Sequence, residues 1–72
     1  MFKISFKDVG ESRVTKDILT QAETLHKAEI VAVAKCTKIL GRDDYALRRY
    51  PDNEYNLDVC GVLLGSFTIV KQ

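Results

Sequence analysis

The sequence predicts an α+β fold: an antiparallel β-sheet of four to five strands with one α-helix packed on one face. The helix is predicted because residues 24–41 place apolar side chains three and four positions apart. Strands are predicted because shorter runs before and after this segment alternate apolar and polar residues. Those runs are the only other apolar material that can cover the helix, so both flanks must contribute to one sheet. The predicted order is β-β-α-β-β-β, in a single domain over residues 1–72.

The predicted helix runs from Thr24 to Gly41. Thr24 immediately precedes the apolar stripe and its hydroxyl can accept the first free amides, so we expect it to be the N-cap. The capping-box pattern of residues 20–23 is an alternative start. Gly41 can adopt the left-handed conformation that ends helices. Ile30 and Ala34 are expected to face solvent or a partner. The buried stripe is expected to consist of Leu25, Ala28, Ala32, Cys36 and Ile39.

The N-terminal residues predict a hairpin. Strict alternation of apolar and polar residues indicates a first strand from Phe2 to about Asp8 with one face in the core. The next four residues supply a turn, and the run from Arg13 to Leu19 is rich in β-branched residues, which predicts a second, antiparallel strand. Its alternation is imperfect, because Lys16 shares a face with apolar neighbours while Leu19 falls on the opposite face. We therefore expect a bulge or an exposed edge there.

Residues 45–59 predict a second hairpin around a turn at Pro51-Asp52-Asn53. We expect a three-residue loop with Asn53 in the left-handed conformation. A four-residue loop would place Leu47 opposite Asp58, whereas the shorter loop pairs apolar residues with each other. The expected pairs are Arg49 with Tyr55, Leu47 with Leu57, and Tyr45 with Val59.

The C-terminal residues predict a last hairpin with a two-residue turn at Gly65-Ser66 and a final strand from Phe67 to Lys71. Inward positions are odd-numbered from Tyr55 to Val59 and even-numbered on the incoming strand of this hairpin, at Val62 and Leu64. The alternation must therefore change phase near Gly61, where glycine tolerates a bulge. The expected pairs are Leu64 with Phe67 and Val62 with Ile69.

Composition and charge exclude several classes of protein. The formal charge of +1 is neither the basic excess of a dedicated nucleic-acid binder nor the acidic excess of a DNA mimic. No apolar run is long enough for a signal peptide or a membrane-spanning segment, so we expect neither. Cys36 and Cys60 lack disulfide-scaffold and metal-ligand spacing, and we expect reduced, core-facing thiols in a cytosolic protein. A redox or metal role is the alternative.

No residue pattern predicts catalysis or a cofactor. His26 is the only histidine, and no carboxylate-serine or cysteine pattern lies near it. The carboxylates of residues 43–58 interleave with arginines and lack the spacing of a calcium loop. The glycines form no phosphate-binding loop. We therefore expect a protein that is not an enzyme and that holds no cofactor or metal.

The sheet face opposite the helix is the candidate partner-binding surface. A mixture of arginine, tyrosine and aliphatic side chains is typical of protein interfaces. The candidate residues are Lys3, Lys7, Arg48, Tyr50, Asn56 and Asp58, and Ser5, Leu63 and Val70 share their face. A solvated second face is the alternative. A surface for single-stranded nucleic acid would need more aromatic side chains than Tyr50. Arg49 and Tyr55 are expected on the helix-covered face.

The run from Leu19 to Ala32, preceded by a hairpin and followed by strands, resembles a pattern in small phage-encoded inhibitors. Residues 22–25 with Ala28 and Ala32 are similar to the strand-to-helix passage of the podophage inhibitor of host RNA polymerase. The element order is also similar to that of some type I anti-CRISPR proteins, in which a sheet and one helix present a charged surface to a CRISPR surveillance complex. The resemblance assigns no functional residue to any position of this chain.

We therefore expect a non-enzymatic binding protein of the phage-inhibitor, anti-CRISPR type, located in the host cytoplasm. It would block a host nucleoprotein complex by occupying a protein-binding or nucleic-acid-binding surface. The alternative is a small nucleic-acid-binding regulatory domain that uses Lys3, Lys7, Arg48 and Arg49. An unpaired strand edge permits self-association, and we expect a monomer or a weak homodimer.

Overall fold

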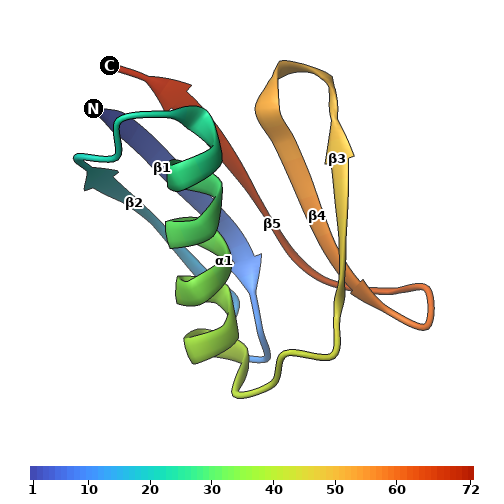
Figure 1. The fold of residues 1–72 in the computed structure, drawn as a ribbon. Helices are drawn as coiled ribbons and strands as arrows, with labels where there is room; N and C mark the ends of the chain where they lie inside the picture. Colours follow the sequence, from blue (N-terminus) through green and yellow to red (C-terminus); the bar gives the residue numbers. More distant parts are fainter.

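Five strands and one helix make up the computed structural model, which describes all of residues 1–72 (Figure 1). The strands form one antiparallel sheet in the order β2-β1-β5-β4-β3, and the predicted β-β-α-β-β-β architecture is confirmed. The helix lies across β1, β5 and β2 on one face of the sheet. The elements are β1 (Phe2–Val9), β2 (Val14–Thr20), α1 (Leu25–Leu40), β3 (Ala46–Tyr50), the short turn η1 (Pro51–Asn53), β4 (Glu54–Val59) and β5 (Val62–Lys71).

The helix begins and ends where the sequence predicts. The Lys27 amide donates to the Thr24 hydroxyl at 3.2 Å, so Thr24 is the N-cap. Gly41 closes the helix at φ 69°, in the left-handed conformation. Ile30 lies on the outer surface and is exposed, as expected. The fully buried part of the stripe consists of three small residues, Ala28, Ala32 and Cys36.

A bulge ends the regular pairing of the first hairpin. Phe6 pairs with Lys16, but the next pair is Val9 with Val14, so β1 contributes one residue more than β2. The expected irregularity is therefore present, and the extra residue belongs to β1. Asp8 adopts φ 53° at this point. The bulge returns Val9 to the core, where it is fully buried, and β1 extends one residue past the predicted Asp8.

The β3–β4 hairpin has the predicted three-residue loop. Its pairs include Leu47 with Leu57 and Arg49 with Tyr55, which confirms the register. Asn53 has the expected positive φ of 57°, and Asp52 is left-handed as well, at 63°. The expected pair of Tyr45 with Val59 does not form, because β3 begins only at Ala46.

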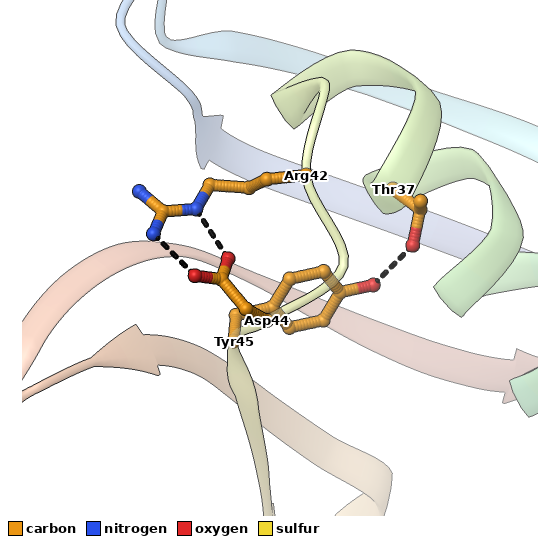
Figure 2. Close-up of polar contacts among 4 residues, drawn as sticks. All are labelled: Thr37, Arg42, Asp44 and Tyr45. Carbon is orange, nitrogen blue, oxygen red and sulfur yellow. Dashed lines mark hydrogen bonds and ion pairs between the residues drawn. The ribbon is translucent and has the colours of Figure 1, made fainter.

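Tyr45 contacts the helix instead (Figure 2). Its hydroxyl donates to the Val33 carbonyl at 3.1 Å and lies 2.7 Å from Thr37 Oγ1, which can supply the proton of that second bond. Arg42 and Asp44, in the same link, form two hydrogen bonds of 2.5 and 2.7 Å with each other. The link from α1 to β3 is thus held against the last turns of the helix.

The predicted turn at Gly65-Ser66 is wrong, because these residues lie inside the continuous strand β5. The turn that joins β4 to β5 is Cys60-Gly61, and both residues have positive φ, 51° and 80°, as a two-residue hairpin of type I′ requires. A Cβ on Gly65 would lie 2.7 Å from the Cα of Val9. Gly65 therefore allows the close approach of β1 and does not form a turn.

Two further expectations change with this turn. Cys60 is exposed at the turn and does not face the core, whereas Cys36 is buried as predicted. The change of phase occurs between the pairs Leu57–Gly65 and Asp58–Leu63, which leaves Leu64 as the extra residue of β5. The pairs predicted for this hairpin do not form; the observed ones are Val62 with Val59, Phe67 with Phe6 and Tyr55, and Ile69 with Ile4.

The core lies between the helix stripe and the middle of the sheet. Phe67 on the central strand β5 is its centre: the Phe67 ring stacks on Tyr55 with centroids 4.5 Å apart and tilts against Phe6 at 5.9 Å. Tyr55 and Leu57 are buried on the helix-covered face, as the register predicts. The two ends of the chain meet at one edge of this core, where the Gln72 amide donates to the Met1 carbonyl at 2.9 Å.

Replacing Gly65 by alanine should lower the free energy of unfolding by about 3 kcal/mol, because the new methyl group would overlap main-chain atoms of Val9. Gly61→Ala is the matched control: it also has positive φ but has no atoms within 4 Å of a new Cβ, and it should cost about 1 kcal/mol. Urea unfolding measures both. Equal losses for the two variants would contradict the close approach at Gly65.

Truncating Tyr55 to alanine should destabilise the fold by roughly 3–5 kcal/mol, because its ring is only 4% exposed and stacks on Phe67. Tyr50→Ala, on the other face of the same hairpin, should change stability by less than about 0.5 kcal/mol. Thermal melts of the two variants decide the matter. A Tyr55 variant that melts like the parent would contradict the position of this ring.

Candidate protein-binding surface

The sheet face opposite α1 is covered by no other element, and we call it the open face (Figure 1). Residues of neighbouring strands that are paired in register form rows across it. One row joins Lys7, Ser66, Asn56 and Arg48, and the next joins Asp17, Ser5, Thr68, Glu54 and Tyr50. The outer rows are Leu19, Lys3 and Val70 at one end and Leu63, Asp58 and Ala46 at the other.

All six predicted partner-binding residues lie on the open face, but in three separate places. Lys7, Asn56 and Arg48 share a row, with Lys7 on β1 and Arg48 on β3. Three strand spacings separate these two cations, which is about 14 Å. Tyr50 lies at the β3 edge of the neighbouring row, and Lys3 lies at the far end near the N-terminus. A partner would have to cover most of the face to meet all of them.

Asp58 holds Arg48 in place. Arg48 Nε and Nη2 donate to the two carboxylate oxygens at 3.0 and 3.5 Å. The guanidinium side chain remains 60% exposed, whereas that of Asp58 is only 10% exposed. Arg48 and the neighbouring strands cover Asp58, so little of its side chain is accessible to a partner. Asp58 orients Arg48 and neutralises its charge.

Exposed apolar side chains also lie on the open face. The most exposed are Leu19 and Leu63, and Val70 and Tyr50 are about half exposed. Leu19 and Val70 flank Lys3 in one row, whereas Leu63 lies beside Asp58. Sequence reasoning assigned Leu19 to the face opposite its apolar neighbours but did not include it in the site, because the strand order that brings β2 beside β1 and β5 was unknown.

The charges of the open face balance. Its cations are Lys3, Lys7 and Arg48, and its anions are Asp17, Glu54 and Asp58. A phosphate backbone is recognised by a surplus of positive charge, and this face has none. The balanced mixture of charged, hydroxyl and aliphatic side chains is typical of a protein-binding surface.

Arg49 belongs to the other face, as predicted, and binds the helix. Its guanidinium donates to the two carboxylate oxygens of Glu29 at 2.5 and 3.2 Å. The hydrogen bond from Arg49 lowers the pKa of Glu29. Burial, together with the nearby Glu29 charge, raises the pKa of Tyr55. Arg49 therefore holds α1 against the β3–β4 hairpin on the helix-covered face, and its side chain remains 61% exposed.

Concave surfaces lie next to β1. A shallow hollow on the open face is lined by hydroxyl and charged side chains, including Ser5, Thr15 and Asp17. A wider groove lies where the β1–β2 turn meets the end of α1 and the start of β5. No buried side-chain polar atom lacks a hydrogen-bond partner, and no group of His, Cys, Asp or Glu residues is placed to hold a metal ion.

The two cysteines lie in different surroundings. Burial raises the pKa of Cys36 to about 12, so its thiol stays protonated and behaves as a small apolar group. Cys60 is exposed at the β4–β5 turn. The only helix, α1, is too short and too polar to cross a membrane.

Comparison with protein-family models, curated proteins and solved structures finds no match to this chain. The open face itself therefore supplies the evidence on function.

Replacing Arg48 by alanine should lower the melting temperature, because the nearly buried Asp58 carboxylate would lose its charged partner. Adding Asp58→Asn to this variant should recover part of the loss, since an amide is less costly to bury than a carboxylate. Circular-dichroism melts of both variants test this. If Arg48→Ala melts like the parent, water reaches Asp58 without Arg48 and the pair has no orienting role.

Proposed function

We propose that this protein is a non-enzymatic binding protein whose open face docks onto a partner protein. One observation carries the proposal: a five-stranded sheet has a helix on one face only, and the uncovered face presents Arg48, Tyr50 and several exposed aliphatic side chains. Interfaces concentrate their binding energy in arginine and tyrosine side chains surrounded by apolar contacts. Arg48 suits this role because Asp58 holds its guanidinium in place while most of it stays accessible.

The partner class follows from the resemblance to small phage inhibitors. The element order β-β-α-β-β-β and the strand-to-helix passage into α1 support an inhibitor of the anti-CRISPR type. Such an inhibitor acts in the host cytoplasm and occupies a surface of a host nucleoprotein complex. The neutral open face favours a protein surface of that complex over its nucleic acid, because it has no surplus of positive charge.

A nucleic-acid-binding regulatory domain is the competing function. Its four proposed cations are Lys3, Lys7, Arg48 and Arg49, and only the two lysines lack a carboxylate partner. Phosphate contacts by two free lysines would leave most of the affinity unexplained. The two functions differ in their response to salt, because affinity carried by phosphate contacts falls steeply as ionic strength rises.

The test places a photo-cross-linking amino acid at position 50, or at position 30 on the helix, and exposes each protein to nuclease-treated host lysate. Tyr50 and Ile30 are both exposed and lie on opposite sides of the molecule. We expect a discrete protein adduct from position 50 and none from position 30. A nuclease-sensitive adduct, or adducts from position 30 alone, would contradict docking through the open face.

Affinity for the captured partner should then fall at least tenfold in the variant Tyr50→Ala/Leu63→Ala, as expected when interface anchors are truncated. The matched control is Ile30→Ala/Val62→Ala, which also removes two exposed apolar side chains but leaves the open face intact. Titration by calorimetry at two salt concentrations measures both effects. Equal affinity losses in the two variants would contradict the assigned face.

A further inference from the structure

The two free edges of the sheet differ in what they offer a partner. β3 is only five residues long, Pro51 follows it, and both of its arginines are held by carboxylates of the same chain. β2 is seven residues long and contains no proline. The outward main-chain groups of β2 have no strand beside them, because β2 ends the sheet. Such an edge can accept another strand through main-chain hydrogen bonds.

One flank of α1 lies above this edge. Glu29 and Thr37 bond to side chains of β3 and of the link before it, so their flank faces the β3 side. A helix turns by about 100° per residue, which places Val31, Lys35 and Lys38 on the opposite side of the buried stripe. That side faces β2. Val31 is 37% exposed there, in keeping with a flank that no other element covers.

Three lysines that form no ion pair lie on the helix side of the same edge. Lys16 pairs with the buried Phe6, so its side chain lies on the helix-covered face at the rim of the sheet. Lys16, Lys35 and Lys38 take part in none of the four ion pairs of the protein. A single inward-pointing lysine is enough to discourage edge-to-edge pairing. Two further free lysines on the helix make the edge selective for an acidic partner.

We propose that the free edge of β2 binds an extended acidic segment of a partner protein, which adds to the sheet as a sixth strand beneath the Lys35–Lys38 flank. Main-chain hydrogen bonds would supply affinity, and the lysines would supply charge complementarity. A segment of about seven residues, some 23 Å long, would match the length of β2. This surface shares only Asp17 and Leu19 with the open face and is centred on the β2 edge, so the inference goes beyond the proposed function.

The two sides of β2 specify the side chains of the added strand. Successive side chains of a strand point to opposite faces. Those on the helix side would meet Lys16, Lys35 and Lys38 and should be acidic. Those on the other side would meet Asp17 and Leu19, and Leu19 is 63% exposed. They should be apolar, because an acidic residue beside Asp17 would be repelled. The edge therefore fits a segment in which acidic and apolar residues alternate.

Other occupants fit this edge less well. A second copy of the chain would bring the same lysines towards each other, and like charges at short distance repel. Single-stranded nucleic acid has no peptide main chain to continue the sheet. It also needs aromatic platforms, and the tyrosines all lie in the β3–β4 half of the protein or in the link before it. A peptide strand matches both the main chain and the charge of the edge.

The experiment titrates ¹⁵N-labelled protein with a blocked heptapeptide in which glutamate and valine alternate, followed by NMR. We expect shifts in β2 amides and slowed hydrogen exchange at alternate residues of β2. A lysine–valine peptide of the same length should bind at least tenfold more weakly. Two further glutamate–valine peptides are titrated in the same way. One is N-methylated at its glutamates and the other at its valines. One of them should lose binding at least tenfold and the other should keep it, because only one set faces β2.

Lysine substitutions test which positive charges attract the acidic peptide. Lys35→Gln/Lys38→Gln and Lys16→Gln should each weaken binding of the acidic peptide several-fold at low salt. Lys71→Gln is the matched control for Lys16→Gln, because it also removes an exposed strand lysine, and Lys71 pairs with Phe2, four residues along β1 from Phe6. Its affinity should stay within twofold of the parent. Circular dichroism of each variant verifies that the fold is intact.

Three results would overturn the inference. Equal binding of both N-methylated peptides would show attraction by charge without strand addition. Shifts confined to the open face or to the β3 edge would place the peptide elsewhere. Competition by a thymidine oligonucleotide for the same β2 amides, with a steep dependence on salt, would make the edge a nucleic-acid site.

Discussion

Burial of one narrow helical stripe against β1 and β5 is the constraint on which the rest of the structure depends. Ala28, Ala32 and Cys36 are small, so the helix axis comes close to the aromatic centre of the sheet around Phe67. A helix is about 10–12 Å wide and strands are about 4.8 Å apart, so one helix covers two to three strands. Five strands therefore cannot all be covered, and the β3–β4 hairpin must be held by other means.

Polar contacts along one flank of the helix attach that hairpin. Glu29 binds Arg49, and Thr37 contacts Tyr45. Eight residues of helix span about 12 Å and four residues of strand about 13 Å, so these two contacts have matching spacing. Both arginines of the hairpin therefore have carboxylate partners. Arg49 binds the helix, and Asp58 orients Arg48 on the open face. The free lysines at the opposite end of the sheet are left without partners.

This division of charge separates two surfaces of different character. The open face is electrically balanced and combines an oriented arginine with exposed aliphatic groups, which suits recognition of a folded protein surface. The β2 edge combines unpaired main-chain groups with uncompensated lysines, which suits an extended acidic chain. Both surfaces arise from the same cause: a single helix leaves one whole face and two edges of the sheet without cover.

The sequence by itself determined the local elements. Apolar spacing and caps located α1 from Thr24 to Gly41, and alternation located β1 and the three-residue loop of the β3–β4 hairpin. These features depend on neighbours a few residues apart, which periodicity reports directly. The same alternation assigned the six candidate residues to the open face. Their arrangement in rows, and the burial of Asp58, could not be predicted without the order of the strands.

Only the tertiary structure determined which glycine near the C-terminus forms a turn and whether Cys60 is buried or exposed. Gly65 and Gly61 are both suited to turns by sequence, because a turn and a close approach of two backbones each require a missing Cβ. Val9, distant in sequence and moved by the β1 bulge, occupies the space beside Gly65, so the turn falls at Cys60-Gly61 and Cys60 is exposed. The partners of Arg48, Arg49 and Tyr45 were likewise unpredictable, because each bond joins residues that only the packing of helix and sheet brings together.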